Sequence, residues 1–95
     1  MEAYTFQRTD LASRTLAARE RTAIDSRIQA DQRVVIDLRN VASISESFAD
    51  ELFGVLVLQR GLGDVTSRLK LINATESVLR SIAVAMQRRS VRHVA

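Results

Sequence analysis

Three serines and two acids form the densest group of side chains in the sequence that could take part in chemistry. Ser43, Ser45, Glu46, Ser47 and Asp50 all lie within residues 43–50. A serine hydroxyl becomes a nucleophile when a neighbouring base activates it; otherwise it can cap a helix or accept a phosphoryl group from another enzyme. Because no histidine lies near this group in the sequence, we expect capping or modification rather than a Ser-His relay.

The composition disfavours the common kinds of catalytic and metal site. The chain has no cysteine and one histidine, His93. A thiol nucleophile is therefore excluded, and a zinc site built from thiolates and imidazoles would have too few ligands. The Gly-Leu-Gly-Asp segment at 61–64 lacks the Lys-Ser/Thr that completes a phosphate-binding loop. We therefore predict no catalytic residues, no metal site and no cofactor, and a protein that is not an enzyme.

Length and hydropathy indicate a single small domain over residues 1–95. Apolar residues make up 46% of the chain and charged residues 26%, which is typical of globular proteins. Apolar runs such as 55–58 are far shorter than the roughly 20 residues that span a membrane. The first ten residues also lack the apolar segment of a signal peptide. We therefore predict a cytoplasmic protein without a membrane segment.

The positive charge is spread along the chain apart from one concentration at its end. The formal net charge is +3, and Arg88, Arg89 and Arg92 form a basic C-terminal tail over residues 88–95. Nucleic-acid binders usually combine a basic stripe with a known motif or with stacking aromatic residues, and here aromatic residues are few. We therefore do not expect nucleic-acid binding, but keep a nucleic-acid-associated regulator that uses this tail as the alternative function.

Strand and helix patterns alternate around the serine group. Apolar and β-branched runs predict strands at residues 4–6, 34–38 and 68–73. Apolar residues at helical spacing predict helices over 10–30, from Ser47 to the glycine turn at 61–64, and after an Asn73 N-cap. This alternation predicts an α/β domain with a mainly parallel sheet of about three to four strands and three helices.

Asp37 and Arg39 lie at the end of the predicted strand 34–38, just before the serine group. Functional side chains of parallel sheets gather at the carboxyl ends of the strands. Two interpretations remain open for this pair: a part of the functional site, or a simple charge pair at a strand end.

The helix that follows the serines is apolar on more sides than one sheet can cover. Its predicted core stripe consists of Phe48, Ala49, Leu52, Val55 and Leu56. Three further apolar residues lie off this stripe: Phe53, Val57 and Leu58. Such a surplus indicates either deep burial or a partner surface. Our hypothesis is that Phe53, Val57 and Leu58 border a partner or dimer surface.

The path from VVIDLRNVASIS into SFADELFG resembles the STAS-like family, small relatives of the STAS domains of bacterial anti-sigma factor antagonists and sulphate transporters. The likeness extends to DLASRTLA upstream and RLKLINATESVLRSI downstream, so it covers about residues 6–85. It implies a small, single STAS-like domain.

In anti-sigma factor antagonists, a strand leads to an Asp-Ser-Ser/Thr turn in which a partner kinase phosphorylates a serine. The resemblance puts Ser45 at the acidic position, Glu46 at the phosphorylated serine and Ser47 after it. Glutamate cannot accept a phosphoryl group, although its charge partly mimics one. The resemblance thus implies that Ser47 or Ser45 is a displaced acceptor, or that phosphorylation is lost. The structural alternative is that Ser47 only caps the helix.

The resemblance implies a non-enzymatic regulatory interaction module. It would bind a histidine-kinase-like ATPase or anti-sigma partner through the turn at residues 43–50 and the following helix, with any nucleotide held by the partner. A homodimer is a third interpretation. The candidate partner-binding residues are Asp37, Arg39, Ser45, Glu46, Ser47, Asp50, Phe53 and Val57.

Overall fold

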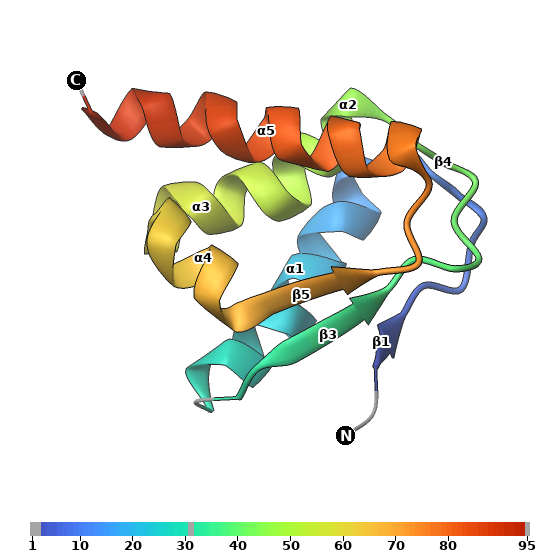
Figure 1. Cartoon of the computed structure of the whole chain (residues 1–95), viewed down its shortest axis with the longest axis horizontal. Helices are drawn as coiled ribbons and strands as arrows, with labels where there is room; N and C mark the ends of the chain where they lie inside the picture. Colours follow the sequence, from blue (N-terminus) through green and yellow to red (C-terminus); the bar gives the residue numbers. More distant parts are fainter. Residues whose placement is uncertain (1–2, 31, 95) are drawn as a thin grey trace.

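The computed structural model describes residues 3–30 and 32–94, with side chains described as far as residue 90. The elements along the chain are β1 (Tyr4–Thr5), β2 (Asp10–Leu11), α1 (Arg14–Gln29), β3 (Val34–Asp37), β4 (Ser43–Ile44), α2 (Glu46–Ala49), the π-helical turn η1 (Asp50–Gly54), α3 (Val55–Arg60), α4 (Leu62–Arg68), β5 (Leu69–Ile72) and α5 (Glu76–Val94). Because α2, η1 and α3 follow one another without a gap, they act as one helical segment (Figure 1). The predicted α/β class is confirmed, and α4 is a helix that the sequence patterns did not predict.

Two parallel sheets organise the domain. The main sheet has the strand order β1-β3-β5, and Ile36 in the central strand pairs with Tyr4 on one side and Leu71 on the other. The second sheet is a short ladder between β2 and β4, in which Asp10 pairs with Ser43. The main sheet confirms the predicted parallel arrangement, and the short ladder places the serine group beside the segment that leads into α1.

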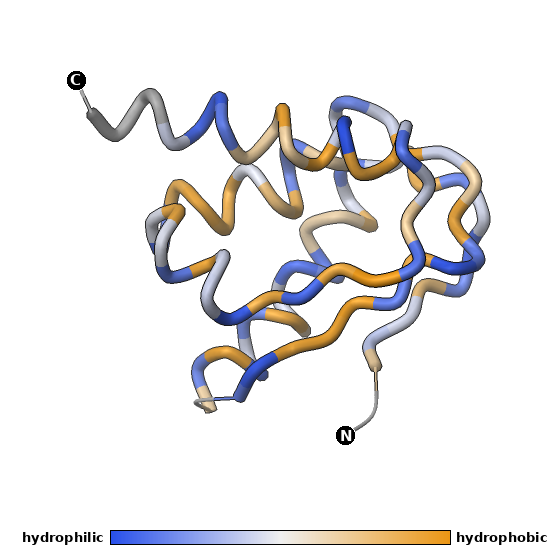
Figure 2. Tube along the Cα trace, in the orientation of Figure 1, coloured by the Kyte–Doolittle hydropathy of each residue, from blue (hydrophilic) through white to orange (hydrophobic). Residues whose placement is uncertain are grey.

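The core lies between one face of the main sheet and the helices. Along β3, Val34 and Ile36 are buried whereas Val35 and Asp37 are only half-buried, as expected for a strand with one covered face. Figure 2 shows the apolar stretches of β3 and β5 beside those of the helices. Inside the core, the rings of Phe6 and Phe48 meet edge-on at a centroid distance of 6.1 Å. The aromatic pair links the start of the chain to α2.

The structure contradicts the hypothesis of a partner surface for Phe53 and Val57, because both side chains are completely buried, whereas Leu58 is 37% exposed. The physical reason is η1. Hydrogen bonds in a π turn skip one residue more than in an α-helix, so every later side chain is rotated relative to the pattern of 3.6 residues per turn. After η1 the buried face passes through Leu56 and Val57, while Val55 is only half-buried.

Three predicted boundaries also shift. Gly61 ends α3 as expected, with a φ of 90°, but α4 begins directly after it. Asp10 and Leu11 form a strand, so α1 begins later than predicted, behind an N-cap at Ser13. The N-cap of α5 is Thr75, whose hydroxyl accepts the Val78 amide at 3.2 Å, and not Asn73. Within the part of the chain that the structure describes, no helix combines the length and apolarity needed to cross a membrane.

Candidate functional site

The turn that carries the serines is held firmly against the chain segment before α1. The Ser45 amide donates to the Leu11 carbonyl at 2.8 Å, which extends the ladder between β2 and β4. The Ser43 hydroxyl donates to Asp10 Oδ1 at 2.6 Å. Backbone and side-chain bonds together therefore fix the conformation of a partly exposed turn.

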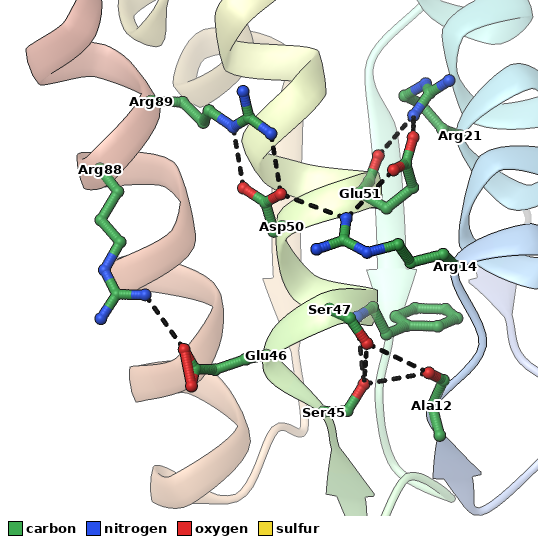
Figure 3. Close-up of polar contacts among 11 residues, drawn as sticks. Ala12, Arg14, Arg21, Ser45, Glu46, Ser47, Asp50, Glu51, Arg88 and Arg89 are labelled. Atoms are coloured by element: carbon green, nitrogen blue, oxygen red, sulfur yellow. Dashed lines mark hydrogen bonds and ion pairs between the residues drawn. The ribbon is translucent and has the colours of Figure 1, made fainter.

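Ser45, and not Ser47, is the N-cap of the helical segment. The amide of Phe48 donates to Ser45 Oγ at 3.1 Å, so the predicted cap is two residues too late. The apolar run begins at Phe48, but a capping hydroxyl bonds the amide three residues ahead, which places the cap before Glu46. Ser47 instead lies in the first turn, where its Oγ is 3.1 Å from Ser45 Oγ and 3.4 Å from the Ala12 carbonyl oxygen (Figure 3).

Glu46 projects from the first turn of α2 towards α5. Its side chain is 83% exposed, and Oε1 accepts a hydrogen bond from Arg88 Nη1 at 3.1 Å (Figure 3). Exposed ion pairs of this kind contribute at most about 1 kcal/mol. Glu46 is therefore a charge at the surface with one weak intramolecular partner.

A network of ion pairs joins η1 to the helices on either side of it. Arg89 on α5 donates to both carboxylate oxygens of Asp50, from Nε and Nη2, at 2.8 Å each. Arg21 on α1 donates to Glu51 Oε2 at 2.6 Å. Arg14 lies between the two acids, 3.4 Å from Asp50 and 3.2 Å from Glu51 (Figure 3). The network thereby fixes η1 against α1 and α5.

These contacts favour the charged form of each acid. Hydrogen bonds from Arg89 hold the pKa of Asp50 below its ordinary value, and a hydrogen bond from Arg21 does the same for the pKa of Glu51. The bond to Asp50 in turn raises the pKa of Arg89. The charged forms of Asp50, Glu51 and Arg89 are thus favoured by the contacts that hold η1 in place.

Gly54 permits the close approach of α5 to η1. A Cβ atom at this position would lie 2.8 Å from Asp50 Oδ1, 3.0 Å from Arg89 Cγ and 3.3 Å from the Ala85 carbonyl oxygen. A larger residue would therefore displace the bidentate pair between Asp50 and Arg89.

A polar cavity of about 580 Å³ opens beside the turn, between α1, the helical segment and α5. Its walls carry charged side chains of both signs together with apolar side chains and serine hydroxyls. Its lining residues are Arg14, Glu46, Ser47, Asp50, Ser81, Val84, Ala85, Arg88 and Arg89. Among the described residues, no group of three or more potential metal ligands occurs.

The structure brings some of the predicted site residues together and separates others. Glu46, Ser47 and Asp50 line the cavity, and Ser45 lies beside them. Phe53 and Val57 lie in the core.

Asp37 and Arg39 do not line this cavity. Asp37 Oδ1 accepts the Arg39 amide at 2.9 Å and Asn73 Nδ2 at 3.1 Å, so it links the ends of β3 and β5. These bonds, chiefly the one from Asn73, lower the pKa of Asp37. The Arg39 side chain is 71% exposed, with Nη2 3.8 Å from Asp37 Oδ2.

The predicted basic C-terminal tail begins within α5, which runs to Val94. Arg88 and Arg89 belong to the ion pairs described above, whereas the side chain of Arg92 lies outside the described residues. Sequence reasoning also missed Arg14 and Arg21. Their spacing of seven residues, which puts both on one helix face, is the signal that could have found them.

A family model described as a STAS-like domain of unknown function (DUF4325) matches residues 19–79. The chain belongs to this family. The region that matches the family model includes β3, the turn at residues 43–50, η1 and β5 of this STAS-like domain. It ends before Arg88 and Arg89. None of the curated proteins and none of the solved structures matches the domain.

Proposed function

We propose that this STAS-like domain is a non-enzymatic regulatory module that binds a protein partner across the turn at residues 43–50 and the first turn of α2. The observation that carries the proposal is the fixed conformation of a polar turn at the surface, in which Glu46 is exposed and Ser45 and Ser47 are half-buried. Ser45 caps the helix and is bonded to the segment before α1, while the side chain of neighbouring Glu46 is 83% exposed. A preformed surface loses little conformational entropy when a partner binds.

The resemblance to anti-sigma factor antagonists suggests the class of the partner. A histidine-kinase-like ATPase or an anti-sigma protein would contact the turn and the cavity beside it, and would contribute any nucleotide. Since Phe53 and Val57 are interior, the contact surface is polar and excludes the apolar side of the helical segment.

Ser47 is the position at which phosphorylation would act on such a complex. Its hydroxyl has only long hydrogen bonds, of 3.1 and 3.4 Å, and it lines the cavity. A phosphoryl group would add about −1.5 to −2 charges at neutral pH. Beside Glu46 this charge would change the contact surface without removing the helix cap at Ser45.

The test begins with affinity purification from native cells and intact-mass measurement, which report the partner and any phosphate together. Ser47→Asp should then weaken the partner complex, whereas Ser47→Ala should leave affinity within about twofold of wild type, a difference under 0.5 kcal/mol. Ser45→Ala is the matched control, because loss of the cap should cost about 1 kcal/mol of stability. Absence of any partner would refute the proposed function. Equal affinities of the Asp and Ala variants, with no phosphate, would limit the role of Ser47 to the fold.

A further inference from the structure

The ion-pair network contains one more cation than it has carboxylates. Asp50 is already bound by two 2.8 Å hydrogen bonds from Arg89, and Glu51 by the 2.6 Å bond from Arg21. Arg14 adds only the longer contacts of 3.4 and 3.2 Å, both through Nη1. Its side chain is 55% exposed. Arg14 is therefore the member of the network with donors to spare.

Arg88 presents a second available guanidinium to the same cavity from α5. Its pair with Glu46 is made by side chains that are 67% and 83% exposed. Because such a pair is weak in water, an incoming carboxylate can replace Glu46 at small cost. Figure 3 shows Arg14 extending from α1 towards α5, on which Arg88 is located.

The rest of the cavity favours a peptide segment over an isolated ion. Val84 is 40% exposed on the same wall as Arg88, and Ala85 lies next to it. The hydroxyls of Ser47 and Ser81 also line the space. A volume of about 580 Å³ accommodates more than one side chain.

We propose that this cavity receives an acidic segment of a protein partner, with a carboxylate held by Arg14 and Arg88 and a neighbouring aliphatic side chain on Val84. Charge complementarity identifies the occupant. Three arginines line the cavity against two acids, and one of those acids, Asp50, is saturated by Arg89. The guanidinium fork matches a carboxylate in geometry as well as in charge. The inference rests on the proposed function, because it specifies the chemistry of the partner at the same surface.

NMR titration of the ¹⁵N-labelled full chain with two capped peptides tests this proposal. The probe is GSLEELSG, and the control is GSLQQLSG, which has the same length without the charge. The acidic peptide should shift the Nε–Hε signals of Arg14 and Arg88 and the amide signal of Val84, and added salt should reverse the shifts. The glutamine peptide should leave these signals in place.

Variants locate the binding site. The double variant Arg14→Gln/Arg88→Gln should bind the acidic peptide about tenfold more weakly, as expected from the loss of two charge-assisted contacts. Arg80→Gln is the matched control, because Arg80 is also on α5, is 68% exposed and does not line the cavity. It should bind like wild type, and melting curves should show that all variants are folded.

The proposal would be overturned by no shift with GSLEELSG, by equal shifts with both peptides, or by equal loss of binding in Arg80→Gln. Succinate shifting the same signals with equal affinity would also overturn it, because the cavity would then recognise a small anion. The proposed function is tested separately. A native partner that depends on the turn but not on Arg14 and Arg88 would refute this inference alone.

Discussion

The two sides of α5 show how one helix is fixed in two different ways. On one side, Arg88 and Arg89 face the polar cavity beside α2 and η1. On the other side, Ile82 and Met86 line an apolar groove of about 260 Å³ with Phe53 and residues of α4 and β5. Burial on the apolar side supplies free energy without directional preference, whereas the bidentate pair on the polar side sets the helix's rotation.

The turn η1 contributes to both sides at once. Phe53 from η1 enters the apolar interior, and Asp50 from the same turn receives Arg89. Gly54 lies against α5 between them. The comparison therefore predicts that changes on the apolar side reduce stability most, and that changes on the polar side act mainly through charge and helix position.

Phe53→Ala should have the largest effect. The side chain is completely buried, and truncation of a buried phenylalanine typically costs about 3–5 kcal/mol. Leu58→Ala is the control, because Leu58 is 37% exposed and should lose clearly less. Urea denaturation measures both. If Phe53→Ala lost little stability but dissociated a dimer, Phe53 would belong to a partner surface and not to the core.

Asp50→Asn should cost about 1–2 kcal/mol at neutral pH, because it removes charge-assisted hydrogen bonds from Arg89. The folded state lowers the pKa of Asp50, so its ionisation stabilises the fold above the unfolded pKa of about 3.9. This stabilisation is lost as the pH falls through the folded pKa. Urea curves at pH 7, 4 and 3 should show a steeper loss below pH 4 in wild type than in Asp50→Asn. Parallel pH profiles of wild type and Asp50→Asn would show that ionisation of Asp50 does not contribute to the free energy of unfolding.

Gly54→Ala and Gly63→Ala form a matched pair with opposite expected signs. At Gly54 the new methyl group meets Asp50 and the Ala85 carbonyl, so we expect a net loss of about 1 kcal/mol despite the better helix propensity of alanine. At Gly63 no atom lies within 4 Å, and alanine should stabilise α4 by up to about 1 kcal/mol. Thermal melting compares the two. Equal stabilisation of both variants would mean that α5 does not depend on close contact at Gly54.

The sequence predicted the features that depend on local pattern. The three strands of the main sheet and their parallel order follow from apolar runs and strand–helix alternation. The glycine at the end of α3 was also read correctly, since its φ of 90° suits glycine. The helix α4 was missed because it is short and begins directly at that glycine.

The candidate site was only partly predictable, because its parts are distant in sequence. The exposed turn followed from local patterns, but the pair between Asp50 and Arg89 spans 39 residues. Arg14 and Arg88 line one cavity only because α1 and α5 both pack against η1. The burial of Phe53 depends on η1, which the pattern of 3.6 residues per turn cannot reveal.

A π turn accommodates one extra residue within an otherwise α-helical segment. If one residue of η1, such as Glu51, were deleted, the helix could close its hydrogen bonds with regular α geometry, and the segment from Ser45 to Ala49 would keep nearly its direction relative to α3. The same deletion from a regular α-helix would instead turn the preceding segment by about 100°. The wide turn thus allows the helical segment to change its length by one residue while the serine-bearing end keeps its place beside α5.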